Sequence, residues 1–183
     1  MIRLAFGIAA ALALVLPTAA SAELAAGAKA PRFTARGAKG GKVFTLSLAN
    51  ALKKGPVVLY FYPKAFTQGC TLEAHAFAEA SDDFRKAGAT VIGMSNDDLP
   101  TLQRFSTEAC RDKFAVAAAT PAIVKAYDVD LVRDGKSTGL TKRTSYVIGR
   151  DGRVRFVHSD MDYKDHVRLT LGAVKALKGK PKG

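Results

Sequence analysis

The sequence is poor in the residues from which metal centres and disulfide scaffolds are built. It contains three histidines and two cysteines. His75, His158 and His166 have no metal-ligand spacing among themselves or with Cys70. A Gly-rich phosphate loop and a dinucleotide fingerprint are also missing. We therefore expect a protein that uses neither a metal ion nor a bound cofactor.

Acidic residues are few as well: 16 Asp and Glu stand against 28 Lys and Arg, which gives a net charge of +12. A protein this basic could bind nucleic acid or an anionic surface. Its positive residues are scattered apart from a short tail at 175–180, however, and no basic-aromatic helix or nucleic-acid motif occurs. We expect the charge to serve solubility and surface adhesion, with no nucleic-acid partner.

The N-terminus has the pattern of a secretory signal peptide. The charged start at residues 1–3 is followed by an apolar run at 4–16 and by the small residues Ala20-Ser21-Ala22. The apolar run is shorter than the roughly 18 residues that a membrane anchor requires. The sequence therefore predicts cleavage before Glu23, export to the periplasm, and no stable membrane insertion of the mature chain.

Beyond residue 22 the sequence predicts one domain. Residues 23–42 are rich in Ala, Gly and Lys and are predicted to be a flexible lead-in, residues 43–178 the folded domain, and residues 179–183 a basic tail. The domain is long enough to bury a real core. There are no internal repeats and no sign of a second domain.

Within this domain strands alternate with helices. Hydrophobic periodicity and turn residues predict strands at 43–46, 57–62 and 89–95, helices at 47–52, 71–87, 101–113, 122–127 and 163–177, and a hairpin of strands 143–148 and 154–158. Residues 131–142 are predicted to be a polar loop. The alternation favours a parallel core, to which the hairpin adds an antiparallel edge. The predicted fold class is α/β, a thioredoxin-like three-layer sandwich with a mixed central sheet.

Cys70 occupies a place in the sequence where a thiol is readily activated. The apolar strand at 57–62 meets Pro63, which cannot continue a central ladder, and a short loop then leads into the helix whose first turn would hold Cys70. Backbone N–H groups and the helix dipole at such a place lower the pKa of a thiol. A fall from about 8.5 to about 6 raises the thiolate fraction at pH 7 about thirtyfold. The alternative, a buried structural cysteine, would lie among apolar residues rather than between Gly69 and Thr71.

The residues around Cys70 resemble a known family. Pro63-x-x-x-Thr67-x-x-Cys70 is similar to the peroxiredoxin motif. Tyr60-Phe61-Tyr62 before this motif and Thr71-x-Glu73 after it resemble the Q-type (bacterioferritin comigratory) branch. Ala30-Pro31-Arg32-Phe33 and the strand that begins Arg143-Thr144-Ser145-Tyr146 resemble the family's N-terminal motif and its active-site arginine strand. The resemblance runs over nearly all the mature chain. It implies a thioredoxin-type fold and a thiol-dependent peroxidase.

The resemblance also implies a role for each matching residue. Cys70 is the peroxidatic thiolate, which attacks the O–O bond of a peroxide and becomes a sulfenic acid. Thr67 hydrogen-bonds the thiolate and the peroxide oxygen, and Pro63 keeps bulk water from the sulfur. Arg143 holds the thiolate charged and stabilises the charge that develops on the leaving oxygen. Taken singly, Pro63 could be only a strand terminator, Thr67 a helix cap and Arg143 a solvated strand-edge residue.

A second thiol would complete the reaction cycle. Many Q-type members have a resolving cysteine five residues after the first, but this chain has His75 there, which we interpret as a solvated helix residue. Some members keep the resolver in the helix after the second parallel strand, where this chain has Cys110. The resemblance therefore implies a transient Cys70–Cys110 disulfide, whose formation requires local unwinding of the turn after Cys70. The alternative for Cys110 is a small core residue.

We predict an exported peroxidase that reduces hydrogen peroxide or organic hydroperoxides and is itself reduced by an external thiol or a thioredoxin-like dithiol protein. Two alternatives stay open. A thiol–disulfide oxidoreductase of thioredoxin fold would have a Cys-x-x-Cys, and Thr67 stands where its first cysteine would be. A non-enzymatic exported protein with a static Cys70–Cys110 bridge fits the cysteine count in an oxidising compartment equally well.

Overall fold

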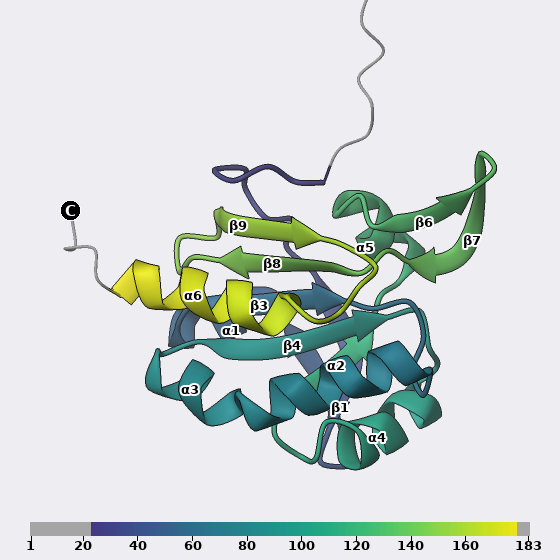
Figure 1. Ribbon diagram of the computed structural model, residues 1–183, viewed down its shortest axis with the longest axis horizontal. Coiled ribbons are helices and arrows are strands. Elements are labelled where there is room, and N and C mark those ends of the chain that lie inside the picture. Colours follow the sequence, from purple (N-terminus) through teal and green to yellow (C-terminus); the bar gives the residue numbers. More distant parts are fainter. Residues whose placement is uncertain (1–22, 179–183) are drawn as a thin grey trace, which may run out of the picture.

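Seven strands form one mixed sheet in the computed structural model, which describes residues 23–178 (Figure 1). Their spatial order is β2 (Lys42–Ser47), β1 (Thr34–Lys39), β5 (Ala115–Ala118), β4 (Thr90–Ser95), β3 (Val57–Phe61), β8 (Thr144–Ile148) and β9 (Val154–Ser159). β3, β4 and β5 are parallel, whereas β1, β2, β8 and β9 join through antiparallel pairs. The predicted signal peptide and basic tail lie outside the described residues.

Helices cover both faces of this sheet. One apolar cluster packs α1 (Leu48–Lys54) and α5 (Pro121–Ala126) against one face. A second cluster packs α2 (Gln68–Glu79), α3 (Ser81–Lys86), α4 (Leu99–Glu108) and α6 (His166–Lys178) against the other face. The predicted thioredoxin-like three-layer sandwich with a mixed central sheet is confirmed.

The central strand β3 sets the position of the candidate site. All five of its residues are buried, as expected for a strand covered on both faces. Phe61, its last residue, is paired with Thr144 of antiparallel β8 and with Met94 of parallel β4. Because Arg143 directly precedes Thr144, this register brings Arg143 beside the loop that runs from Pro63 to Cys70.

Two strands of the sheet differ from the sequence prediction. Thr34–Lys39, predicted to lie in a flexible lead-in, is strand β1 between β2 and β5, so the lead-in prediction is wrong over this segment. Ala115–Ala118, for which no strand was predicted, is β5. Both segments are rich in Ala or Gly rather than in β-branched residues, and neighbouring strands supply the stabilisation that their own propensity lacks.

The prediction of a polar loop at 131–142 is also wrong. Most of this segment forms a separate hairpin of β6 (Asp130–Arg133) and β7 (Lys136–Thr141). Asp134 and Gly135 both have positive φ, of 51° and 73°, as a two-residue hairpin turn requires. The Asp-Gly pair is therefore the signal that could have identified this hairpin.

Two predicted helices end earlier than expected. The helix predicted at 71–87 is interrupted at Ala80, which separates α2 from α3. Leu72 has helical spacing with the apolar residues Ala76 and Phe77, but its side chain is 41 % exposed. The apolar side of α2 is therefore open to solvent near the start of the helix. The helix predicted at 101–113 ends at Glu108, so Cys110 lies in the turn that follows it.

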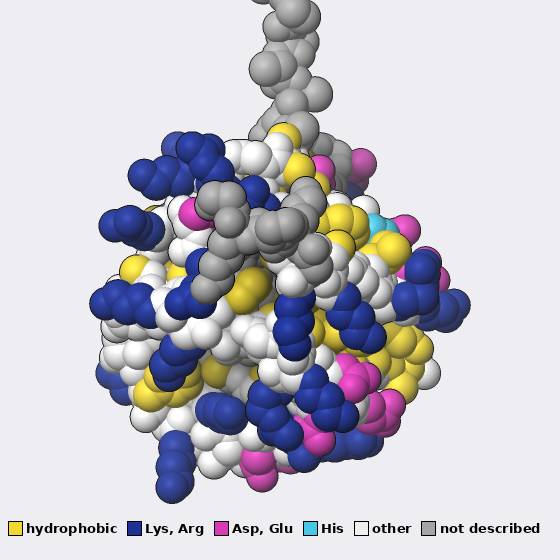
Figure 2. All heavy atoms as spheres, turned by 90° about the vertical axis from the view of Figure 1, so that its left-hand side faces the viewer, with side chains coloured by type: hydrophobic (Ala, Val, Ile, Leu, Met, Phe, Trp, Pro, Cys, Tyr) yellow, Lys and Arg dark blue, Asp and Glu magenta, His cyan; other side chains and the backbone are white. Residues whose placement is uncertain are grey.

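On one face of the molecule, the positive side chains are scattered as predicted. Figure 2 shows Lys and Arg side chains spread over one face of the molecule, with fewer Asp and Glu among them, rather than gathered into one patch. Within residues 23–178, none of the helices has the length and apolar character needed to cross a bilayer.

Candidate active site

Cys70 lies in the first turn of α2, as predicted, and its side chain is buried with 2 % exposure. The turn is closed by the Thr71 N–H, which donates to the Thr67 carbonyl oxygen at 2.9 Å. Gly69 leaves space on the side that faces Arg143, because a Cβ there would lie 3.3 Å from Nη2 of that residue. The local sequence therefore places a buried thiol at a helix start with room for a cation beside it.

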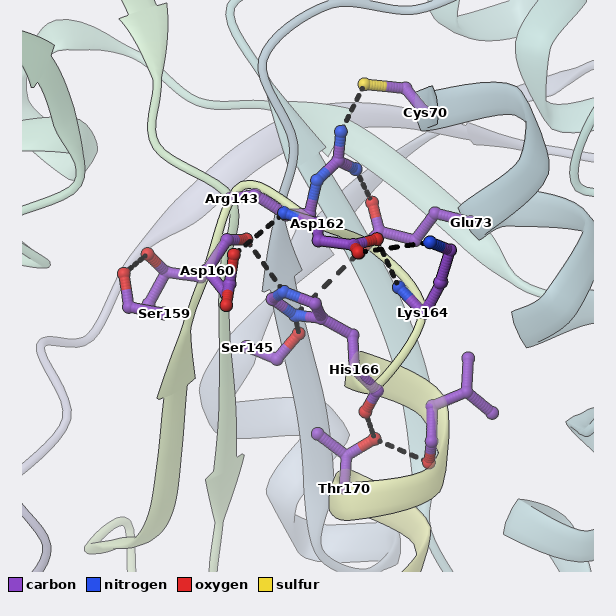
Figure 3. Close-up of polar contacts among 12 residues, drawn as sticks. Cys70, Glu73, Arg143, Ser145, Ser159, Asp160, Asp162, Lys164, His166 and Thr170 are labelled. Atoms are coloured by element: carbon purple, nitrogen blue, oxygen red, sulfur yellow. Dashed lines mark hydrogen bonds and ion pairs between the residues drawn. The ribbon is translucent and has the colours of Figure 1, made fainter. Parts of the chain in front are cut away.

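Arg143 supplies that cation (Figure 3). Its Nη2 donates to Cys70 Sγ at 3.5 Å, its Nη1 donates to Glu73 Oε2, and its Nε donates to the Met161 carbonyl oxygen at 3.0 Å. Burial alone would lower the pKa of Arg143, but Glu73 and Cys70 outweigh it and raise the pKa. The guanidinium thus carries a permanent positive charge, and its hydrogen bonds to Glu73 and to the Met161 carbonyl oxygen hold it beside the sulfur.

Glu73 is a site residue that the sequence analysis missed. It follows Cys70 by three residues, so it lies on the same side of α2, and it is fully buried. Burial raises the pKa of its carboxyl group to about 8, although Arg143 acts in the opposite direction. The helical spacing from Cys70 was the available signal, and a carboxyl group on a buried helix face indicated a buried partner.

Thr67 lies at the N-cap position of α2, and its side chain makes no capping hydrogen bond. Its hydroxyl donates instead to the Lys64 carbonyl oxygen at 2.9 Å. With its hydrogen committed there, the oxygen can still accept a hydrogen bond from a protonated peroxide. Pro63 is half-buried just beyond β3. The roles predicted for Thr67 and Pro63 stay predictions.

Cys110 is fully buried, and both thiols are free. Burial, followed by the nearby charge of Asp112, raises the pKa of Cys110 well above its ordinary value. Cys110 and Cys70 belong to the same apolar cluster. Arg111 and Asp112, the next two residues, have φ of 50° and 60°, a strained conformation for residues other than glycine. In this fold, Cys110 is therefore a protonated, buried thiol that lies directly before a strained turn.

An aromatic stack connects α2, which contains Cys70, with α4, which precedes the turn that contains Cys110. Tyr60 stacks on Phe77 of α2 with ring centroids 4.3 Å apart, and Tyr62 stacks on Phe105 of α4 at 5.3 Å. The two tyrosine rings lie 5.5 Å from each other. All four rings belong to the apolar cluster that contains Cys70 and Cys110.

His75 is the histidine next in the sequence to the Cys70 motif. His75 is half-buried on α2, five residues after Cys70. Among residues 23–178, no group of three or more His, Cys, Asp or Glu side chains is placed to hold a metal ion. The chemical groups that the fold brings together are a buried thiol, a guanidinium and a carboxyl group.

Comparisons with known proteins agree with this arrangement. Residues 26–157 match the model of the AhpC/TSA family. The chain is 32 % identical over 152 residues to a chloroplastic peroxiredoxin Q of Oryza sativa subsp. japonica, a match that covers 82 % of this chain and 67 % of the relative.

Two solved structures have the same fold. Peroxidoxin BcpB from Mycobacterium tuberculosis is 28 % identical and superposes with a TM-score of 0.75 over 84 % of this chain and 98 % of that one. The bacterioferritin comigratory protein of Xanthomonas campestris, whose alkyl peroxide reduction activity has been studied, is 27 % identical with a TM-score of 0.69, over 78 % and 91 % of the two chains. The resemblance predicted from the sequence is confirmed: the chain belongs to the AhpC/TSA family and is a peroxiredoxin of the Q-type branch.

Proposed function

We propose that Cys70 is the peroxidatic cysteine of this thiol-dependent peroxidase, and that Cys110 resolves it. The observation that carries the first part is the 3.5 Å contact between Arg143 Nη2 and Cys70 Sγ in a site with 2 % exposure of the cysteine. The guanidinium donates a hydrogen bond to the sulfur and places a positive charge beside it, and the thiolate is the nucleophile of the reaction.

In the first step the Cys70 thiolate attacks the terminal oxygen of a hydroperoxide. A sulfur–oxygen bond forms, the O–O bond breaks, and the alkoxide or hydroxide that leaves takes up one proton to give an alcohol or water. Cys70 becomes a sulfenic acid. Arg143 can stabilise the negative charge first on the sulfur and then on the leaving oxygen. The free lone pairs of the Thr67 hydroxyl can accept a hydrogen bond from the peroxide and so orient it.

The second step would use Cys110. Its thiol sulfur attacks the sulfenic sulfur, the Cys70–Cys110 bond forms, and the sulfenic oxygen leaves as water with the thiol hydrogen. An external dithiol then reduces this disulfide by thiol–disulfide exchange, which restores both thiols and leaves the reductant oxidised to its own disulfide. Support for Cys110 comes from its place in the same apolar cluster as Cys70 and from the strained turn that follows it. The raised pKa of the buried thiol favours a mechanism in which the turn opens before Cys110 reacts.

Organic hydroperoxides are the substrate class that the surroundings favour. Three of the large apolar side chains that are exposed belong to segments that build the site: Phe66 before Thr67, Leu72 after Cys70, and Met161, whose carbonyl oxygen binds Arg143. Their side chains are 38 %, 41 % and 51 % exposed. An alkyl group on the peroxide could contact them, whereas hydrogen peroxide has no such group. We further propose that the enzyme acts outside the cytoplasm, so that its reductant is an exported thioredoxin-like protein.

Peroxide consumption with a dithiol reductant tests the first part. We expect Cys70→Ser to consume no peroxide above background, and neither protein to reduce insulin. Insulin reduction by the wild type would favour a thiol–disulfide oxidoreductase instead. Equal peroxide consumption by wild type and Cys70→Ser would contradict the role of Cys70.

Mass spectrometry after one equivalent of peroxide tests the role of Cys110. We expect an intramolecular Cys70–Cys110 disulfide in the wild type and a lasting Cys70 sulfenic acid in Cys110→Ser. Lasting sulfenic acid in the wild type, with the same turnover in Cys110→Ser, would leave a one-cysteine enzyme that uses an external thiol directly.

A further inference from the structure

His166, the first residue of α6, is fully buried, and the steps described above do not use it. Its Nε2 lies 2.9 Å from the Asp160 carbonyl oxygen, and its Nδ1 lies 2.8 Å from Ser145 Oγ. Because a carbonyl oxygen can only accept, Nε2 carries the hydrogen and donates it to Asp160. In the neutral ring Nδ1 then accepts the hydroxyl hydrogen of Ser145, so both ring nitrogens have partners.

Asp160 begins the connection between β9 and α6, and we call residues 160–162 the strap. The strap is bonded to Arg143 twice. The Asp160 N–H donates to the Arg143 carbonyl oxygen at 3.2 Å, and Arg143 Nε donates to the Met161 carbonyl oxygen at 3.0 Å. His166 fastens the same strap through the Asp160 carbonyl oxygen (Figure 3). The position of the guanidinium therefore depends on a segment that His166 holds.

A second link between His166 and Arg143 runs through Glu73. Oε2 of Glu73 accepts from Arg143, whereas Oε1 has no hydrogen-bond partner among the described residues and lies 3.8 Å from His166 Nδ1. Burial raises the pKa of Glu73 to about 8, against the pull of Arg143, and burial lowers the pKa of His166 to about 4. Burial therefore disfavours a charge on the imidazole and on the carboxyl group alike, whereas the guanidinium between the carboxyl group and the sulfur stays charged.

Other groups around the ring also act on its charge. The His158 ring of β9 packs against it with centroids 4.5 Å apart, and both His158 and Arg143 disfavour a second positive charge there. Asp160 acts in the opposite direction, through its carbonyl oxygen and its charge. In the same connection Asp162 pairs with Lys164 at 3.3 Å. Burial, His158 and Arg143 together keep His166 neutral.

We propose that His166 is a positioning residue of the Cys70 site: through its hydrogen bond to the strap, it holds the Arg143 guanidinium against the sulfur. The inference rests on the proposed role of Cys70. His166 itself touches neither the sulfur nor the peroxide, so its effect passes through Arg143. The site thus extends from α2 to the start of α6.

Two substitutions of His166 test the inference. His166→Phe keeps a ring and removes both hydrogen bonds, whereas His166→Gln keeps a neutral donor that can reach the Asp160 carbonyl oxygen. A shift of the guanidinium by about 1 Å can cost on the order of a hundredfold in rate. We expect His166→Phe to slow formation of the Cys70 sulfenic acid by about tenfold to a hundredfold. We also expect the ultraviolet thiolate absorbance of this variant to titrate at higher pH, and His166→Gln to recover most of both properties.

Thr170→Val is the matched control. Thr170 is buried one turn further along α6, and its hydroxyl donates to the His166 carbonyl oxygen at 2.6 Å, but it does not touch the strap. We expect this variant to lose stability without a change in the thiolate titration. The inference is overturned if His166→Phe titrates and reacts as the wild type does, or if Thr170→Val moves the titration equally.

Two further outcomes keep the test decisive. If His166→Phe does not fold, His166→Asn replaces it, because its shorter side chain does not reach the Asp160 carbonyl oxygen; equal rates for the Asn and Gln variants would then overturn the inference. A wild type that forms no Cys70 sulfenic acid would refute the proposed function itself. Normal sulfenic acid formation that is insensitive to position 166 would refute only the role of His166.

Discussion

Arg143 and Cys70 are 73 residues apart in the sequence, and their side chains meet at 3.5 Å in the interior. The antiparallel pairing of β3 with β8 produces this contact, because it sets the residue before β8 beside the loop that follows β3. The same guanidinium also binds Glu73 and the Met161 carbonyl oxygen. Its orientation is therefore determined by two separate segments of the chain: α2, which supplies Cys70 and Glu73, and the strap, which supplies the Met161 carbonyl oxygen.

Substitution of Arg143 should affect the peroxide step strongly. Arg143→Lys keeps a positive charge but cannot donate to the sulfur, the carboxyl group and the carbonyl oxygen at once. We expect sulfenic acid formation to slow by on the order of a hundredfold in this variant, and by more in Arg143→Gln, which has no charge. Stopped-flow measurement with one equivalent of peroxide gives these rates. A wild-type rate in Arg143→Gln would exclude an electrostatic role for the guanidinium.

Gly69→Ala should separate stability from activity. Replacing glycine by alanine inside a helix stabilises it by up to about 1 kcal/mol. The new methyl group would lie 3.3 Å from Arg143 Nη2, so the guanidinium has to shift. We expect a protein that unfolds at higher denaturant concentration and yet forms the sulfenic acid about tenfold more slowly.

Gly172→Ala in α6 is the control for this prediction, because nothing lies within 4 Å of its added methyl group. It should gain a similar amount of stability at an unchanged rate. If both alanine variants react at the wild-type rate, the close approach of Gly69 to Arg143 has no functional consequence.

Stability should depend on pH through Glu73 and His166, with opposite signs. The folded pKa of Glu73, about 8, lies above its ordinary value of 4.5, so folding takes up a proton between these pH values and stability falls as the pH rises. The folded pKa of His166, about 4, lies below its ordinary value of 6.5, so stability rises with pH between these values. In the wild type the two effects oppose each other from about pH 4.5 to 6.5, and the fall due to Glu73 remains from about 6.5 to 8.

Urea unfolding at a series of pH values tests these signs. Glu73→Gln should leave only the rise between pH 4 and 6.5 that belongs to His166. His166→Gln should leave a fall over the whole interval from 4.5 to about 8 that belongs to Glu73. Parallel profiles for the wild type and both variants would mean that neither group titrates differently on folding.

The strained turn after Cys110 gives a prediction for the resolving step. Arg111 has a φ of 50°, which glycine adopts without the cost of about 1–2 kcal/mol that other residues carry. Arg111→Gly should therefore stabilise the closed turn and slow Cys70–Cys110 disulfide formation about fivefold, while sulfenic acid formation keeps its rate. Quenched-flow alkylation followed by mass spectrometry resolves the two steps.

Glu79→Gln controls for the ion pair that this substitution also removes, since Glu79 Oε1 lies 3.3 Å from Arg111 Nη1. An exposed pair of this kind contributes little, so Glu79→Gln should resolve as the wild type does. Faster disulfide formation in Arg111→Gly would show that the strain does not promote opening.

The sequence was sufficient for the strands and helices with strong local patterns. β3 and β4 are β-branched and apolar, and the Pro63 to Cys70 spacing with Arg143 identified the centre of the site. Strands β1 and β5 were not predicted, because their sequences are rich in Ala and Gly and depend on neighbouring strands for stability. The partners of Arg143 were not predicted for a related reason: Glu73 and Met161 lie far from Arg143 in the sequence and meet it only through tertiary contacts.

His166 illustrates the same limit. In the sequence it is one of three histidines without metal-ligand spacing, and nothing nearby indicates burial. Only the folded chain places Ser145, Asp160 and Glu73 around its ring. Long-range contacts of this kind depend on tertiary packing rather than on local periodicity.

We expect the Cys70 sulfur, beside the Arg143 guanidinium, to be the atom that reacts with the peroxide. The most direct measurement is to react Cys110→Ser with one equivalent of peroxide, trap sulfenic acid with a dimedone-type reagent, and locate the adduct by mass spectrometry. We expect one adduct, on Cys70, which is lost when Cys70 is also replaced by Ser and formed far more slowly when Arg143→Gln is added. An unmodified Cys70 with peroxide still consumed, or equal labelling with and without the Arg143 charge, would contradict it.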